Sequence, residues 1–291
     1  MKFSGPEQRI LNDNRSGSSE ILNSTLRYNL QYLTTLRRKQ PSNGHLIFFN
    51  DHVIRKFMSM TMVANGLNRA NLILTEATDK DSPVKDVIEK IRQLIEEIAE
   101  IDKLVIRNCR SLFKRKITVA TYSNSGLVKS VIGHYRARIR EVYISESRPA
   151  GEGKEAALNF SKAGIRVMYM VDACLPDMLA KADLLLLGAD SVGDRIFVNK
   201  IGSSTLLKIA RSEEVRSVVV FESLKLTKDE DRLICRDDYN RREIWTGRLP
   251  RNINIKNSYF ETIPNKMVNL FISDKGVDDC KSLRQTIRSL Q

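Results

Sequence analysis

Apolar residues recur at helical spacing through the first third of the chain. A helix is predicted to begin at the small polar residues Gly17–Glu20 and to bury the apolar stripe between Ile21 and Leu33. A second helix is predicted from about His52 to Ala77, where methionine and leucine side chains supply core volume. A third begins at Ser82 and carries one apolar face from Val84 to Val105. This part of the chain therefore predicts a helical domain.

From Ile117 onwards the pattern changes to short apolar runs separated by helical stretches of about ten to fifteen residues. The predicted strands are Ile117–Tyr122, Glu141–Ile144, Ile165–Val171, Leu184–Gly188 and Val218–Phe221. Such alternation is typical of βαβ units, in which helices cover both faces of a parallel sheet. We therefore predict an α/β protein: a helical N-terminal domain at residues 1–115, followed by a doubly wound, mainly parallel sheet domain at residues 116–291.

The composition is that of a globular chain and excludes several other classes. Of the 291 residues, 42% are apolar and 29% are charged. The apolar runs are too short to span a membrane, and the N-terminus lacks the apolar run of a secretory signal. We therefore expect a cytoplasmic protein with no membrane partner. The four cysteines stand singly and there are three histidines, which form no zinc or disulfide pattern, so we expect no metal and no cofactor.

Basic residues outnumber acidic ones by 48 to 35, which gives a net charge of +13. This excess is compatible with a nucleic acid as partner and equally with an anionic small molecule. The basic clusters are short and are not interleaved with aromatic residues on which bases would stack. Nucleic-acid binding is therefore an alternative that no motif supports.

Polar residues follow the predicted strands, and in an open parallel sheet ligands bind beyond the carboxyl ends of the strands. Basic side chains and helix N-termini at that edge are suited to phosphate groups, while Asp190 is placed to accept a proton or to hold a sugar hydroxyl. Taken singly, such residues are more often helix caps; their coincidence at one edge favours a binding site. The residues predicted to bind the ligand are Asn124, Ser125, Glu146, Arg148, Asn199, Lys200, Gly202, Ser203 and Lys225.

Several motifs around these residues resemble one protein family. They are Glu146–Pro149, Val171–Ala173, Leu187–Ser191, Val198–Ser203 and Glu222–Lys225, with Gly17–Leu22 and Phe260–Pro264 at the two ends. The family joins the alpha, beta and delta subunits of eukaryotic translation initiation factor 2B to two sugar-phosphate isomerases. Those isomerases act on methylthioribose-1-phosphate and ribose-1,5-bisphosphate. The resemblance implies a Rossmann-like C-terminal domain and a homodimer or higher homo-oligomer formed through it.

The resemblance also implies two catalytic positions, of which one is changed here. In the family's isomerases a cysteine and an aspartate flank the reacting carbons of the sugar. The aspartate position is Asp190, whereas the cysteine position is occupied by Ser123. A thiol titrates at pH ~8.5 but an unactivated serine hydroxyl titrates far higher, which makes the hydroxyl a poor acid or base at neutral pH. The family's Arg-Gly phosphate-binding turn aligns with Val63–Gly66, which contains no arginine.

Two hypotheses follow. The first is a translation initiation factor 2B subunit-like protein that binds a phosphorylated sugar or nucleotide without turnover and works through a protein partner. The second is an aldose–ketose isomerase of a ribose phosphate that uses Asp190 and Ser123 as its catalytic residues.

Overall fold

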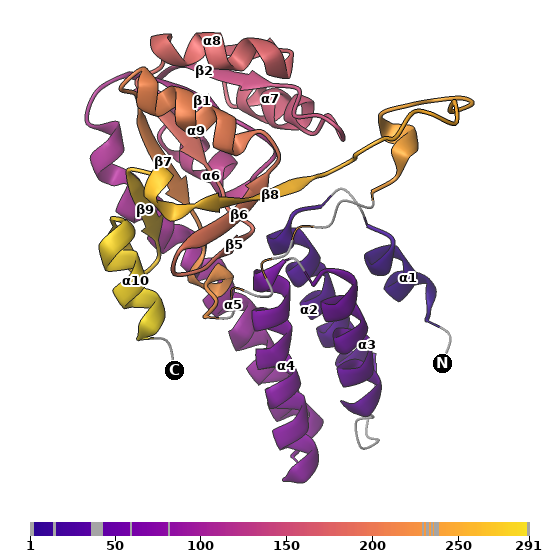
Figure 1. The fold of residues 1–291 in the computed structure, drawn as a ribbon. Helices are drawn as coiled ribbons and strands as arrows, with labels where there is room; N and C mark the ends of the chain where they lie inside the picture. The colour runs from indigo at the N-terminus through magenta and orange to yellow at the C-terminus, as the bar shows by residue number, and fades with distance from the viewer. Residues whose placement is uncertain are drawn as a thin grey trace. The chain divides into compact units, whose positions relative to one another are not determined.

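The computed structural model describes residues 3–13, 16–35, 43–58, 60–80, 82–228, 230, 233, 235 and 239–289 (Figure 1). The chain divides into two compact units, Met1–Lys103 and Leu104–Gln291. The domain boundary that we predicted, after residue 115, falls between the 3-10 helix η1 (Cys109–Phe113) and strand β1 (Ile117–Thr121).

The first unit is helical, as predicted. Its helices are α1 (Gly5–Leu11), α2 (Ser18–Thr35), α3 (Asn43–Lys56), α4 (Thr61–Asp79) and α5 (Val84–Asn108), the last of which runs past the division between the units. The apolar stripe of α2 is buried, with Ile21, Leu22 and Leu26 at most 1% exposed. In the described part of the chain, none of the helices has the length and apolar character needed to cross a membrane.

The single helix predicted from His52 to Ala77 is wrong, because the chain turns between α3 and α4. The N–H of Met60 donates to the carbonyl of Phe57, with 2.8 Å between N and O, and Met58 is 56% exposed. The turn allows α3 and α4 to pack side by side, which buries Phe49 of α3 and Leu67 of α4 completely. The sequence Phe57-Met58-Ser59-Met60 contains no strong helix breaker and would allow the helix to continue. Burying an apolar face on each of two packed helices outweighs this local preference for a continuous helix.

A chain of asparagine hydrogen bonds links three of these helices. Asn29 on α2 donates to Asn50 on α3 over 3.1 Å, and Asn50 donates to Asn71 on α4 over 2.8 Å. Asn29 and Asn50 are fully buried. Because buried amides are costly unless they are hydrogen-bonded, these contacts fix the register of the three helices.

The segment Val63–Gly66, which the resemblance aligned with a phosphate-binding turn, lies inside α4 instead. A Cβ atom on Gly66 would lie 2.5 Å from Cδ2 of Leu22 on α2. Gly66 therefore permits the close approach of two helices, and within this unit its role is packing.

The second unit contains a seven-stranded sheet in the order β10-β9-β7-β4-β1-β2-β3. All neighbouring strands are parallel except β10 and β9. The strands are β1 (Ile117–Thr121), β2 (Ile139–Ser145), β3 (Val167–Met170), β4 (Leu184–Leu187), β7 (Arg216–Val220), β9 (Leu270–Ser273) and β10 (Gly276–Asp278). The chain winds outwards from β1 to β3 and then returns to the other side of β1, so the predicted doubly wound α/β class is confirmed.

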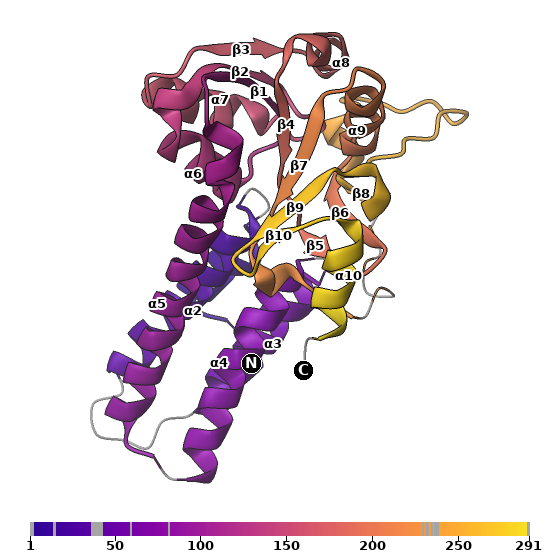
Figure 2. The same ribbon diagram turned by 90° about the vertical axis from the view of Figure 1, so that its left-hand side faces the viewer.

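Helices cover both faces of this sheet (Figure 2). Helices α6 (Gly126–His134) and α7 (Gly153–Lys162) lie on one face, and α8 (Leu175–Met178) and α9 (Ser203–Ser212) lie on the other. The central strands β1 and β4 are buried along their whole lengths, which explains their continuous apolar sequences.

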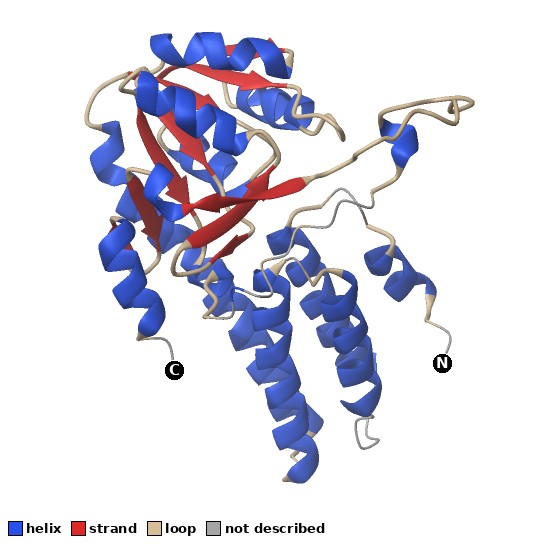
Figure 3. Ribbon diagram, in the orientation of Figure 1, coloured by secondary structure: helices blue, strands red, loops and turns tan. Residues whose placement is uncertain are grey.

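A second, three-stranded sheet and the C-terminal strands were not predicted. The small sheet has the order β5-β6-β8 and is antiparallel; its strands are β5 (Ser191–Val192), β6 (Ile196–Lys200) and β8 (Phe260–Pro264) (Figure 3). Helix α10 (Cys280–Arg288) follows β10. The strand β8 pairs with β6 although some sixty residues separate them, so no local pattern indicates the pairing.

Candidate functional site

The structure brings most of the predicted site residues to the carboxyl edge of the large sheet. Ser123 follows β1, Glu146 follows β2 and Asp190 follows β4. Lys225 follows β7, and Lys200 is the last residue of β6. Four parallel strands and one strand of the small sheet thus deliver side chains to one region, as expected where the winding direction of a doubly wound sheet reverses.

Ser123, Glu152 and Lys200 form one connected group. The hydroxyl of Ser123 donates to Oε1 of Glu152 over 3.0 Å, and Nζ of Lys200 lies 2.7 Å from the same oxygen. The Lys200 side chain is 3% exposed, and its ammonium lies over the ring of Tyr259, 4.7 Å from the ring centre. This ion pair and cation–π contact compensate for the loss of water around the buried ammonium.

The carboxyl of Asp190 interacts with several charged side chains. It is half-buried, and the loss of solvent raises the pKa of its carboxyl from 3.8 to about 6. Lys225 and Lys200 lower this pKa, whereas Glu222 and Glu152 raise it. The carboxyl of Asp190 therefore changes its charge close to neutral pH, as a general acid or base requires.

The turns after β1 and β2 are held by two serines with left-handed backbones. Ser123 has φ +70° and Ser147 has φ +63°, and the N–H of Ser123 donates to Oγ of Ser147 over 2.9 Å. The N–H groups of Ser147 and Arg148 each donate to Asp172 over 2.7 Å. Such conformations persist only where several contacts impose them, and they are enriched at functional sites.

The two helix N-termini at this edge differ. At α9, the carboxylate of Glu261 accepts the N–H groups of Gly202 and Ser204, over 2.8 Å and 2.9 Å, and the Ser204 hydroxyl over 2.6 Å. At α6, Ser125 caps the helix through Val128, while the N–H groups of Gly126 and Leu127 meet no acceptor within the described residues. Free donors for an anion are therefore at α6, and those at α9 already hold a carboxylate.

The side chains of Asn199 and Ser203 form hydrogen bonds within the protein. The Asn199 amide donates to the Ser203 hydroxyl over 3.0 Å, and that hydroxyl donates to the carbonyl of Lys200 over 2.7 Å. Gly202, with φ +102°, makes the sharp entry to α9, where a Cβ would approach the Tyr122 hydroxyl to 3.1 Å. These three predicted ligand residues shape the loop that presents Lys200.

The remaining predicted residues surround this group. Arg148 is exposed, and its guanidinium donates to the carbonyl of Glu243 over 2.6 Å. Glu146 is half-buried, and its backbone pairs with β3. Asn124 precedes Ser125 in the turn after β1, and its Oδ1 is buried without a hydrogen-bond partner in the described structure.

The sequence analysis assigned no site role to Glu152, Glu261 or Tyr259, although Glu261 lies within the motif Phe260–Pro264. Glu152 lies between Gly151 and Gly153 at the start of α7. The local pattern that could have indicated it as a site residue is a charged side chain within a glycine turn that follows a strand. Glu261 and Tyr259 belong to β8 and the segment before it, and only the pairing of β8 with β6 brings them to this edge.

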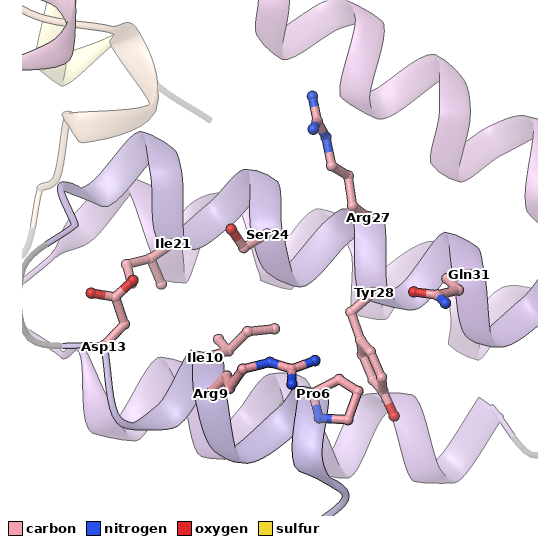
Figure 4. A pocket seen from close by; sticks show the side chains of 9 residues that line it. All are labelled: Pro6, Arg9, Ile10, Asp13, Ile21, Ser24, Arg27, Tyr28 and Gln31. Atoms are coloured by element: carbon pink, nitrogen blue, oxygen red, sulfur yellow. The ribbon is translucent and has the colours of Figure 1, made fainter.

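A separate pocket of about 350 Å³ lies in the first unit, between α1 and α2 (Figure 4). Figure 4 shows Arg9 and Pro6 of α1 facing Tyr28 of α2, whereas Arg27 points away from α1. The lining contains none of the predicted site residues. Elsewhere, no group of three or more histidine, cysteine, aspartate or glutamate residues in the described ranges is arranged to hold a metal ion.

Comparison with known proteins agrees with the resemblance seen in the sequence. The model of the initiation factor 2 subunit family matches residues 32–280. The ribose 1,5-bisphosphate isomerase of Archaeoglobus fulgidus is 25% identical over 198 residues, which cover 66% of this chain and 63% of that protein. The methylthioribose-1-phosphate isomerase of Pelotomaculum thermopropionicum is 30% identical over 180 residues, which cover 57% of this chain and 48% of that protein. The matched segments thus span about half to two thirds of these relatives.

Among solved structures, the translation initiation factor eIF-2B of Pyrococcus horikoshii OT3 superposes with a TM-score of 0.75 at 19% identity. The superposition covers 94% of this chain and 95% of that one. At this identity the similarity establishes the fold.

Proposed function

The chain belongs to the initiation factor 2 subunit family, and on that premise we propose that it is a translation initiation factor 2B subunit-like protein that binds a phosphorylated sugar or a nucleotide without converting it. The ligand lies at the carboxyl edge of the large sheet, and the protein acts in the cytoplasm as a homodimer or higher homo-oligomer through contacts with a protein partner.

The observation that carries the proposal is the convergence of Lys200, Lys225 and Asp190 beyond the strand ends. The two lysines supply positive charge for a phosphate, and the free N–H groups at the start of α6 supply further donors. Asp190 is suited to accept hydrogen bonds from sugar hydroxyls.

The absence of turnover in the proposal rests on Ser123. Its hydroxyl donates to Glu152, whose carboxylate is already paired with Lys200. Because the oxygen that accepts the Ser123 hydroxyl already pairs with the Lys200 ammonium, the contact orients Ser123 without activating it as a nucleophile or acid.

An isomerase is the second candidate, and the raised pKa of Asp190 favours it. Interconversion of an aldose and a ketose needs a group that exchanges protons near neutral pH, which Asp190 provides. Lys200 and Lys225 would stabilise the negative charge that develops on the sugar oxygen. In this reading Ser123 contributes a hydrogen bond in place of the thiol of the family's isomerases.

One experiment separates the two candidates. The purified chain is titrated calorimetrically with ribose 5-phosphate, ribose 1,5-bisphosphate, methylthioribose 1-phosphate and adenosine monophosphate, and each mixture is then followed by NMR for several hours. We expect at least one compound to bind and to remain unchanged. Conversion of a bound compound would establish the isomerase instead, and the absence of binding to all four would contradict both candidates.

A further inference from the structure

Two donors from distant parts of the chain converge on one oxygen atom. Oε1 of Glu152 lies 3.0 Å from the hydroxyl of Ser123 and 2.7 Å from Nζ of Lys200. Ser123 belongs to the turn between β1 and α6, and Lys200 ends β6. The position of that oxygen is therefore determined by two separate segments of the sheet edge.

A hydroxyl and an ammonium directed at one point form a site for a negatively charged oxygen. The Lys200 ammonium is confined there, because its side chain is 3% exposed and packs over the ring of Tyr259. An anionic oxygen that accepts from both Ser123 and Lys200 would lie where Oε1 of Glu152 now lies.

We propose that Ser123 and Lys200 form an anion subsite and that Glu152 is its built-in competitor, whose carboxylate the phosphate of a ligand displaces. The inference rests on the proposed function, since it concerns the same edge of the sheet. It adds a form of regulation: the affinity for phosphate depends on the free energy needed to displace the Glu152 carboxylate from Ser123 and Lys200.

The environment of Glu152 is consistent with displacement. Its side chain is 20% exposed, so a path to solvent exists. Its second oxygen, Oε2, is buried and has no hydrogen-bond partner within the described residues. Moving the carboxylate therefore costs the two contacts of Oε1, and a phosphate oxygen would restore both of them.

The test compares the full chain with the variants Glu152→Gln and Glu155→Gln, using inorganic phosphate as the probe in calorimetric titrations. Glu155 lies exposed on the first turn of α7, so its variant removes the same charge without touching the subsite. We expect Glu152→Gln to bind phosphate about tenfold more tightly than the parent. We expect Glu155→Gln to stay within about twofold, because exposed charges act weakly.

Equal or weaker binding by Glu152→Gln would overturn the proposal, and so would an equal gain in Glu155→Gln. Circular dichroism and thermal unfolding verify that each variant is folded. If Glu152→Gln does not fold, Glu152→Asp takes its place, because the shorter side chain keeps the charge and withdraws it from Lys200; a smaller gain in phosphate affinity is then expected, and no gain overturns the proposal.

The outcomes also separate this inference from the proposed function. Binding by the parent without a gain in Glu152→Gln contradicts the competitor role alone. Binding of phosphate by Glu152→Gln but not by the parent supports the competitor role, and the proposed function then fails only if the parent binds none of the four compounds named above. If neither protein binds phosphate, the competitor role is contradicted, and both proposals fail if the parent also binds none of the four compounds.

Discussion

Nζ of Lys225 lies 2.8 Å from Oε2 of Glu222, and the two side chains are 6% and 1% exposed. They stand three residues apart, directly after β7. Lys200, at the end of β6, forms a second ion pair of this kind with Glu152. Removing one partner from such a pair leaves a charge in a poorly solvated place, which costs far more than the pair itself contributes. The lysines of this edge are therefore held in place by carboxylates, and Asp190 titrates within the field of both pairs.

The raised pKa of Asp190 predicts a stability that depends on pH. Because its folded-state pKa is about 6 and its ordinary value is 3.8, the folded protein holds more protons than the unfolded chain between about pH 4 and 6. The free energy of unfolding therefore falls as pH rises through that window, by about 3 kcal/mol.

We expect Asp190→Asn to abolish this fall, as measured by urea unfolding between pH 4 and 7. Asp177→Asn, an exposed substitution on α8, is the control and is expected to keep the parent's dependence on pH. If Asp190→Asn and the parent showed the same dependence, the raised pKa would be refuted.

Lys200→Met is expected to lower the free energy of unfolding by about 2–4 kcal/mol and to weaken phosphate binding at least about tenfold. The substitution leaves Glu152 half-buried without its ammonium partner and removes the contact with Tyr259. Lys208→Met, on the exposed side of α9, is expected to change stability by less than about 0.5 kcal/mol. Urea unfolding and calorimetric titration with phosphate measure the two effects; equal losses in both variants would show that Lys200 has no special role.

Glu261→Gln is expected to destabilise the second unit by about 1–2 kcal/mol, because the charged carboxylate accepts three hydrogen bonds at the N-terminus of α9. Glu213 lies exposed at the other end of the same helix, where a negative charge opposes the helix dipole. Glu213→Gln should therefore be neutral or slightly stabilising. Thermal unfolding of both variants tests the difference, and an unchanged melting temperature in Glu261→Gln would contradict the capping role.

Gly66→Ala is expected to cost about 1–3 kcal/mol, because the new methyl group would overlap with the side chain of Leu22, which is fully buried and would have to shift within the core. Gly133, in α6, has open space at the same position, so Gly133→Ala should stabilise the protein by about 0.5–1 kcal/mol. Opposite shifts in the urea midpoint are the expected result. A stabilised Gly66→Ala variant would show that α2 and α4 do not pack closely.

The helical first unit and the doubly wound sheet could be predicted from the sequence because both follow from local patterns. The stripe from Ile21 to Leu33 has the period of a helix with one buried face, and continuous runs such as Leu184–Leu187 are typical of strands buried on both sides. The polar residues after those strands could be predicted for the same reason: their positions along the chain are fixed by where each strand ends.

Contacts between distant segments were decided by the tertiary structure alone. The turn between α3 and α4 contains no helix breaker and exists because two helices pack more apolar surface than one. The pairing of β8 with β6 brings Glu261 to α9 and Tyr259 to Lys200, which no local pattern encodes. Glu152 fills the point where Ser123 and Lys200 converge. Local sequence patterns thus indicate which groups stand at the edge of the sheet. Packing determines which of these groups neutralise one another, because charge pairing depends on distance in space and not on separation along the chain.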